Sequence, residues 1–452
     1  MNKKIRKILL CIAAVLMIFL CATVGNSKAG EGNRNKSRSI KANAAETESS
    51  FDVVDTEEDS YMVYGDVDFK EEEKASDGDA IESISAQAAN TAEKDEIAEK
   101  IDEMTIEEKV AQLFIITPEA LTDNTGVTMA GDATKEAIDK TPVGGIIYMG
   151  DNLQSKTQVQ EMLSNTNEYS EERMGLPMFL CVDEEGGTVA RIAGSGRFDV
   201  DRVGNMSDVG ATGDEENARK AGETIGTYLS DLGFNVDFAP VADVLTNPDN
   251  SIVKYRSFGS DSDTVSDMSV AMAKGLESKG LEAVYKHFPG HGATAGDTHL
   301  GAAFTNKSVD ELSESELVPF QKAIDDGASF IMVSHISAPG ITGHDTPASL
   351  SDIIITDILR DKMGYKGIVI TDAMEMGAIS QKYSSSEAAI LALEAGADII
   401  LTPENFRDAY EGVLGAVDSG KISEERIDES VRRILEVKMN MDEPRDYADN
   451  SK

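Results

Sequence analysis

The sequence feature that most constrains the fold is a regular alternation, between residues 95 and 440, of short apolar runs with longer amphipathic stretches. Eight apolar runs are predicted to be buried strands: 110–117, 145–149, 177–183, 235–244, 281–287, 330–335, 367–372 and 397–402. Apolar residues recurring at i, i+3 and i+4 predict helices at 158–173, 218–232, 268–279, 310–326, 352–363 and 387–395. A last helix is expected at about 423–439. Helices of this length between buried strands indicate parallel pairing through right-handed crossovers. The pattern predicts an α/β protein with a single (β/α)8 TIM-type barrel.

The predicted barrel occupies residues 95–441 and is followed by a polar tail at 442–452. An open, doubly wound sheet is the alternative arrangement of alternating strands and helices. That fold commonly carries a glycine-rich dinucleotide-binding turn after its first strand. No such turn follows residues 110–117, so the barrel is the preferred prediction.

The N-terminal residues have the three-part pattern of an export signal. Four basic residues precede an apolar run from Ile8 to Val24, and small and polar residues follow as far as Ala29. We therefore expect residues 1–29 to be a signal peptide. The run is almost long enough to span a bilayer, so an uncleaved membrane anchor is the second interpretation. Either one predicts a secreted or cell-surface extracellular protein, with membrane attachment in the second case.

Charge and cysteine content exclude several classes of protein. Residues 30–94 are rich in Asp, Glu, Ser, Ala and Asn, which predicts a disordered acidic linker.

The 452-residue chain has a net charge of −40 and no basic patch beyond its N-terminus, so we expect no nucleic-acid partner. Cys11 and Cys21 lie in the apolar run and Cys181 stands alone in the barrel, so we expect neither a disulfide nor a cysteine-based zinc site. We expect a monomer.

Polar and charged side chains lie at the ends of several predicted strands. Asp183 ends the third strand, Lys286 and His287 end the fifth, His335 ends the sixth and Asp372 ends the seventh. In a (β/α)8 barrel the carboxyl ends of the strands meet at one rim, where the active site lies. We therefore expect these side chains to converge on one site.

The five histidines of the chain all lie between residues 287 and 344. One interpretation of this cluster is a metal site, because imidazole and carboxylate groups suit zinc and similar ions. Its ligands would be His287, His291, Asp297 and His299. Pro289 and Gly290 interrupt the helix that usually brings histidines four positions apart onto one face. We therefore expect no metal and no other cofactor.

The second interpretation of the cluster is acid–base chemistry. Asp297 lies two residues before His299 in a glycine-bearing loop, where its carboxylate can accept a proton from one imidazole nitrogen. The other nitrogen is then able to act as an acid or base near neutral pH. Asp372, which follows an apolar strand, is placed to act as a carboxylate nucleophile across the barrel mouth.

Five segments carry a family resemblance. They are DEEGGTVAR (183–191), RSFG (256–259), KHFPGHG (286–292), DTH (297–299) and ITDAM (370–374). In this order, within about residues 100 to 440, they resemble glycoside hydrolase family 3, and specifically its bacterial β-N-acetylglucosaminidase branch.

The resemblance implies a retaining mechanism in which Asp372 forms a glycosyl-enzyme intermediate. It also implies that His299, assisted by Asp297, acts as the general acid and then as the base. In most retaining glycosidases a second carboxylic acid has this role. Residues implied to bind the sugar are Asp183, Arg191, Arg256, Lys286 and His287.

The implied substrate is a terminal β-linked N-acetylglucosamine of peptidoglycan fragments or chitin oligomers. Three alternatives remain at this stage: a β-glucosidase of the same family, an N-acetylglucosaminide phosphorylase, and a catalytically silent sugar-binding barrel. β-Glucosidases of the family usually add a second domain and lack the Asp-x-His loop. The set Asp297, His299 and Asp372 is intact, which argues against a silent barrel.

Overall fold

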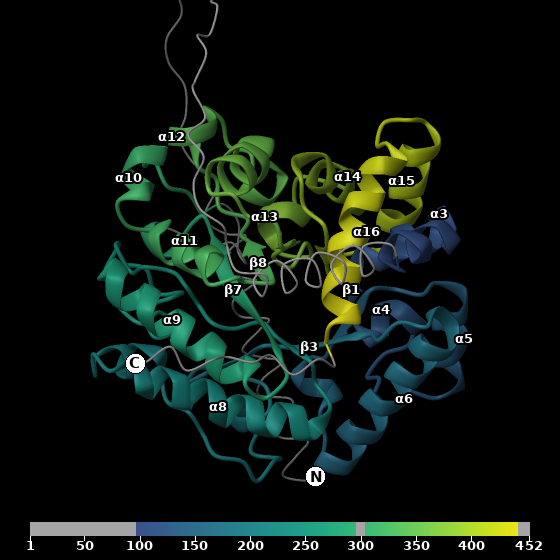
Figure 1. Ribbon diagram of the computed structural model, residues 1–452, viewed down its shortest axis with the longest axis horizontal. Coiled ribbons are helices and arrows are strands. Elements are labelled where there is room, and N and C mark those ends of the chain that lie inside the picture. The colour runs from purple at the N-terminus through teal and green to yellow at the C-terminus, as the bar shows by residue number, and fades with distance from the viewer. Residues whose placement is uncertain (1–95, 295–302, 442–452) are drawn as a thin grey trace, which may run out of the picture. The chain divides into compact units, whose positions relative to one another are not determined.

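The computed structural model describes residues 96–294 and 303–441 (Figure 1). Several predictions fall on parts of the chain outside these ranges: the signal peptide or anchor at 1–29, the linker at 30–94, the tail at 442–452, Asp297 and His299. Within the two described ranges, no helix is both long enough and apolar enough to cross a membrane.

Eight parallel strands form the central sheet of the described residues. In pairing order they are β10 (Ile400–Leu401), β1 (Phe114–Ile116), β2 (Gly145–Ile147), β3 (Phe179–Val182), β6 (Val236–Asp237), β7 (Glu282–Phe288), β8 (Phe330–Val333) and β9 (Ile368–Thr371). A parallel bridge between Ile370 and Ile399 joins β9 to the segment that enters β10, so the sheet closes on itself. The predicted (β/α)8 barrel is confirmed, and every predicted strand overlaps an observed one.

Helices surround the barrel (Figure 1). The longer ones are α3 (Ile106–Gln112), α5 (Asp132–Lys140), α6 (Lys156–Met174), α8 (Glu215–Leu232), α9 (Ser262–Glu277), α11 (Val318–Asp325), the π-helix η5 (Ile353–Lys362), α14 (Ser385–Ala395), α15 (Phe406–Asp418) and α16 (Glu424–Met439). Shorter helices are α4 (Pro118–Thr122), α7 (Met206–Gly210), α10 (Val309–Ser313), α12 (Pro339–Thr342) and α13 (Gly377–Ser380). Single 3-10 turns are η1 (Gly150–Asn152), η2 (Ala193–Ser195), η3 (His291–Ala293) and η4 (Ala348–Leu350).

Local sequence sets where these helices begin and end. Helix α6 begins at a capping box, in which the Ser155 hydroxyl accepts a hydrogen bond from the amide of Gln158. It ends at Gly175, whose φ of 66° is a left-handed conformation that glycine adopts without strain. Helix α8 ends in the same way at Gly233, with a φ of 100°. Each glycine turns the chain from a helix toward the next buried strand.

Some predicted boundaries were wrong. The predicted strand 110–117 begins only at Phe114, because a capping box at Thr105 starts α3 and takes up the first part of the run. Of the predicted strand 235–244, only Val236–Asp237 pairs in the sheet, and the rest forms a loop. The predicted helix 310–326 is two helices, α10 and α11. The sequence analysis did not predict α3, α5 or α15.

One buried carboxylate ties the outer helices to the barrel. Asp398 accepts hydrogen bonds from Nη2 of Arg360 on η5 (2.5 Å) and from Nη1 of Arg433 on α16 (2.9 Å). It also accepts one from the hydroxyl of Ser430 on α16 (2.7 Å) and one from the backbone amide of Val369 in β9 (2.9 Å). These contacts fix the last helix against the barrel wall, at the start of β10 and therefore away from the carboxyl ends of the strands.

Three segments that follow strand ends shape one rim of the barrel. The hairpin of β4 (Glu184–Gly186) and β5 (Val189–Ala190) follows β3. It turns at Gly186 and Gly187, which have φ values of 88° and 54°. The loop after β6 packs tightly on the turn after β7. A Cβ atom on Gly292 would lie only 2.0 Å from the carbonyl oxygen of Val244, so this close approach requires glycine.

Candidate active site

A cavity of about 320 Å³ opens at the carboxyl ends of the strands. Its walls come from the ends of β2, β3, β7, β8, β9 and β10 and from the loops that follow β3 and β6. Its polar and charged lining residues are Asp183, Glu185, Arg191, Arg256, Lys286, His287, His291, Asp372, Glu375 and Thr402. All the sugar-binding residues predicted from the sequence, and Asp372, therefore line one cavity.

Lys286 is the buried cation at the floor of this cavity. Its side chain is 3% exposed, and its ammonium lies 2.9 Å from Oδ1 of Asp183 and 2.7 Å from Oε1 of Glu185. Burial alone would lower the pKa of Lys286, but the charges of Asp183 and Glu185 outweigh it and raise that pKa. Lys286 is therefore a fixed positive charge between two carboxylates.

Arg256 completes the charge network from the loop that precedes α9. Its Nε and Nη2 atoms each donate to Glu185 at 2.7 Å, a bidentate contact with a side chain that is 1% exposed. Burial alone would raise the pKa of Glu185, but the charges of Arg256 and Lys286 hold it well below its usual range. Arg191, the second predicted arginine, lies farther off, with Nη2 at 3.6 Å from Asp183.

His287 is the penultimate residue of β7 and lies between a carboxylate and a guanidinium. Its Nδ1 lies 2.7 Å from Oδ2 of Asp243, and its Nε2 lies 3.2 Å from Nη2 of Arg256. The adjoining Phe288 is fully buried, and its ring packs edge-on against Phe320 with the centroids 5.3 Å apart. Phe288 is therefore part of the core and does not reach the cavity.

Asp372 follows β9 and is partly buried at the cavity wall. Its Oδ1 accepts a hydrogen bond from the amide of Ala373 (2.8 Å), and its own amide donates to the carbonyl of Val333 (2.8 Å). Burial alone would raise the pKa of Asp372, but His287, His335, the Ala373 amide and Lys286 together lower it. Asp372 is therefore an ionised carboxylate at neutral pH.

His335, which the sequence predicts to lie on the same rim, does not line the cavity but packs against the turn that carries Asp372. It is buried, with Nδ1 at 2.7 Å from the hydroxyl of Ser349 and Nε2 at 2.9 Å from the carbonyl of Ala373. Because Ala373 is the residue that follows Asp372, this contact fixes the turn that carries the carboxylate.

The sequence of the chain matches a known protein family. Residues 105–437, about three quarters of the chain, match the family described as "Glycosyl hydrolase family 3 N terminal domain". The chain belongs to glycosyl hydrolase family 3. The resemblance of its five motifs to this family is confirmed.

This family-3 chain is similar in sequence and structure to several proteins named as β-hexosaminidases or β-N-acetylglucosaminidases. It is 32% identical over 330 residues to "Beta-hexosaminidase A" of Pseudoalteromonas piscicida, covering 68% of this chain and 55% of that protein. It is 34% identical over 343 residues to "Beta-hexosaminidase LpqI" of Mycobacterium tuberculosis, covering 73% and 82%. Among solved structures, a family-3 β-N-acetylglucosaminidase from Paenibacillus sp. str. FPU-7 superposes with a TM-score of 0.70 at 37% identity, covering 75% of this chain and 63% of that one.

Two functional candidates in the family-3 barrel were missed by the sequence analysis. Glu185, which joins Arg256 to Lys286, lies inside the DEEGGTVAR motif, but only Asp183 and Arg191 were singled out there. Asp243 lies in the run 235–244, which the sequence predicts to be a strand. The run contains two carboxylates, Asp237 and Asp243, and a carboxylate in an otherwise apolar run is a signal, because a buried charge requires partners.

The predicted acid–base pair, Asp297 and His299, belongs to residues 295–302, outside the described ranges. The metal interpretation used the same two residues with His287 and His291, whose ring centroids are 5.9 Å apart. In the described ranges, no three His, Cys, Asp or Glu side chains are grouped so that they could hold a metal ion.

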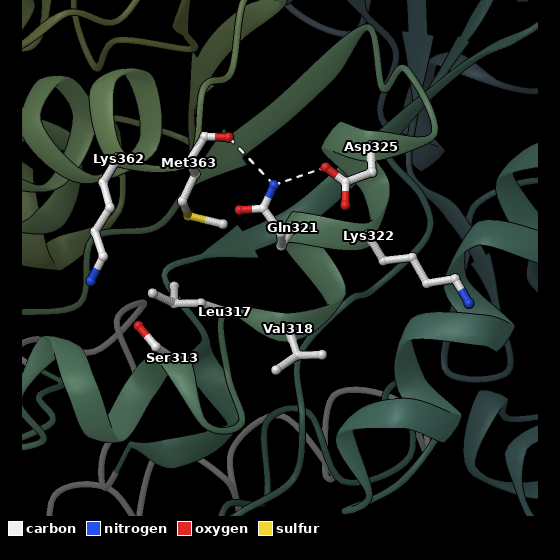
Figure 2. Close-up of a pocket in the computed structure, with 8 residues that line it drawn as sticks. All are labelled: Ser313, Leu317, Val318, Gln321, Lys322, Asp325, Lys362 and Met363. Atoms are coloured by element: carbon white, nitrogen blue, oxygen red, sulfur yellow. Dashed lines mark hydrogen bonds between the residues drawn. The ribbon is translucent and has the colours of Figure 1, made fainter.

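A second cavity, of about 380 Å³, lies outside the barrel between α10, α11 and the end of η5 (Figure 2). Nε2 of Gln321, one of its lining residues, donates to Oδ1 of Asp325 (2.9 Å) and to the carbonyl oxygen of Met363 (3.4 Å), as the dashed lines show. The remaining lining residues are Ser313, Leu317, Val318, Lys322 and Lys362. None of the residues predicted to be functional lines this cavity.

Proposed function

We propose that the chain is a retaining exo-β-N-acetylglucosaminidase that removes terminal β-linked N-acetylglucosamine from peptidoglycan fragments or chitin oligomers. The observation that carries the proposal is the ionised Asp372 carboxylate in the wall of a cavity whose floor is a network of paired charges. Relatives named β-hexosaminidase and β-N-acetylglucosaminidase support the choice of substrate.

In the proposed first step, an oxygen of Asp372 attacks the anomeric carbon. The bond from that carbon to the leaving oxygen breaks, and the leaving oxygen takes a proton. His299, oriented by Asp297, supplies this proton and then takes one from the water that hydrolyses the glycosyl ester. This role for His299 rests on the family resemblance of the DTH motif at 297–299.

The charged network is proposed to recognise the sugar. Asp183, Arg191, Arg256, Lys286 and His287 offer donors and acceptors to hydroxyl groups and to the acetamido group. A site built in this way rejects an analogue that lacks one of these groups, because its own buried polar atoms then remain unpaired. The network therefore predicts a strong preference for the N-acetylglucosaminide over the glucoside.

The test is an assay of the purified chain on p-nitrophenyl β-N-acetylglucosaminide and on the matching β-glucoside. Hydrolysis of the first must be far faster, and equal rates on both substrates would refute the assignment. Added inorganic phosphate distinguishes hydrolysis from phosphorolysis, since only a phosphorylase releases N-acetylglucosamine 1-phosphate. Mass spectrometry of the quenched reaction should find the glycosyl adduct on the peptide that contains Asp372.

We also propose that the enzyme works outside the cell, exported by residues 1–29 and held away from the membrane or wall by the acidic residues 30–94. The proposal rests on the sequence of these segments. N-terminal sequencing of the protein from culture medium and from membranes tests it. A protein that retains Met1 and remains in the cell interior would refute it.

A further inference from the structure

Asp243, which has no role in the proposed chemistry, is fully buried beneath His287. Its two oxygens have different partners. Oδ2 lies 2.7 Å from Nδ1 of the His287 ring, whereas Oδ1 accepts from the backbone amides of His291 (2.6 Å) and His287 (3.3 Å). One oxygen therefore holds the ring, and the other holds the backbone of the turn after β7.

These contacts keep Asp243 ionised. Burial alone would raise the pKa of Asp243, but the contacts with His287 and His291 outweigh it and lower that pKa. An ionised carboxylate is only an acceptor, so the proton in the contact with His287 must be on Nδ1 of the ring.

The opposite edge of the ring faces a donor. Nη2 of Arg256 carries two protons, of which one points to Oε1 of Glu185 (2.7 Å) and the other to Nε2 of His287 (3.2 Å). A guanidinium cannot accept a hydrogen bond, so Nε2 of His287 must present its lone pair. Its two partners thus define His287 as a neutral imidazole with its proton on Nδ1.

This tautomer decides how Arg256 is held. Glu185 fixes Nε and one proton of Nη2, and His287 fixes the other proton of Nη2. Among the described residues, none accepts a hydrogen bond from Nη1 of Arg256, although Arg256 lines the cavity. The protons of Nη1 are therefore the ones that can reach a sugar.

We propose that Asp243 is a positioning residue, which fixes His287 as the Nδ1–H tautomer and thereby holds the guanidinium of Arg256 in place to bind the sugar. The inference rests on the proposed function of the cavity, since it assigns Arg256 to the sugar. It adds a residue that acts only through His287.

The substitution Asp243→Asn separates the ring contact from the backbone contacts. The amide oxygen takes the place of Oδ1 and still accepts from the His291 amide, whereas the NH2 group takes the place of Oδ2 and donates to Nδ1. His287 must then carry its proton on Nε2, where it opposes the N–H of Arg256. We expect kcat/KM to fall about 10- to 100-fold, the equivalent of one hydrogen bond to a charged group, mostly through a higher KM.

Two comparisons distinguish positioning from a structural role. In the His287→Ala background, Asp243→Asn should change kcat/KM less than about 2-fold, because the residue that it acts through is absent. The matched control is Asp398→Asn, a fully buried carboxylate that binds arginines at the other end of the barrel. It should lower Tm and leave kcat/KM of the folded enzyme unchanged. An equal loss from Asp243→Asn with and without His287 would overturn the proposal.

The tautomer itself can be measured in the full chain. Long-range 1H–15N spectra of the imidazoles contain only five histidines, and His287→Gln identifies the signals of His287. The wild type should show a neutral ring protonated on Nδ1, and Asp243→Asn should show Nε2–H. A wild-type ring protonated on Nε2, or on both nitrogens at pH 7.5, would overturn the proposal even if the variant fails to fold. A wild type that shows the expected ring but no N-acetylglucosaminidase activity would refute the proposed function instead.

Discussion

Glu185→Gln is the change that best tests the charge network beneath the cavity. Glu185 is 1% exposed and accepts two hydrogen bonds from Arg256 and one from Lys286, each at 2.7 Å. Glutamine has the same shape but no charge, and its NH2 group must face a donor nitrogen of Arg256. Lys286 keeps Asp183 as a partner at 2.9 Å, whereas Arg256 loses the carboxylate that it contacts.

The cost follows from the burial of these groups. Removing one partner of a buried ion pair costs about 3 to 5 kcal/mol, because the other charge remains buried without compensation. In Glu185→Gln, Asp183 still pairs with Lys286, and the amide oxygen of the glutamine still accepts one hydrogen bond. We therefore expect a loss near the lower end of this range, about 3 kcal/mol of unfolding free energy. In a barrel of this size, this corresponds to a fall in Tm of about 5 °C.

Urea denaturation followed by circular dichroism measures the loss, since the chain has no tryptophan to report unfolding. The matched control is Glu184→Gln at the adjacent buried carboxylate, whose partners are the neutral donors Ile192 N, Ala193 N and the Tyr228 hydroxyl, each at 2.8 Å. We expect a smaller loss there, of about 1 to 2 kcal/mol. A loss below about 1 kcal/mol in Glu185→Gln, or one no larger than in the control, would refute this reasoning.

The effect of pH gives a second check on Glu185. Its pKa is lower in the folded than in the unfolded chain, so its stabilisation is complete above the unfolded value of about 4.3. It is lost as the pH falls below that value, toward the lower folded-state pKa. The difference in unfolding free energy between wild type and Glu185→Gln should therefore be constant from pH 5 to 8 and shrink only in acid. A difference that disappears between pH 8 and 6 would assign the effect to another group.

Three further predictions concern catalysis, and one concerns the linker. Asp372→Asn should abolish turnover of natural disaccharides and aryl glycosides alike, so steady turnover of either by this variant would exclude it as the nucleophile. His299→Ala should lose about 10²- to 10⁴-fold on natural disaccharides and much less on aryl glycosides with acidic leaving groups, with Asp297→Ala in between; an equal factor on all substrates would mean another acid. Exhaustive chelation should leave activity unchanged, whereas loss restored by zinc would support the metal interpretation. Limited proteolysis should remove residues 30–94 and leave a core that starts near Asp95, and protection of the linker would contradict its predicted disorder.

The barrel was predictable because burial leaves a direct trace in the sequence. Strands covered on both faces are continuous apolar runs, and the covering helices show one apolar stripe. The ends of these elements were less predictable, because apolar content does not report where pairing stops. The run 235–244 is mostly apolar, yet only Val236–Asp237 joins the sheet, and the loop that follows carries Asp243.

The site was predictable where it depends on topology alone. Asp183, Lys286, His287 and Asp372 were found because carboxyl ends of parallel strands meet at one rim. Pairwise contacts between distant residues were not predictable in this way. Arg256 lies 71 positions from Glu185, and His287 lies 44 positions from Asp243, and no spacing rule connects residues so far apart.

The charge network and Asp372, the proposed nucleophile, follow opposite electrostatic rules. In the network, each buried charge touches an opposite one, which holds Asp183, Glu185, Lys286 and Arg256 rigid. Asp372 forms no ion pair with any arginine or lysine of the described ranges. Its pKa is lowered by the neighbouring side chains His287, His335 and Lys286 and by the Ala373 amide, which keeps it ionised without a direct ion pair. A carboxylate neutralised by contact would be a poorer nucleophile, so an Asp372 that pairs with no lysine or arginine of the described ranges fits the role proposed for it.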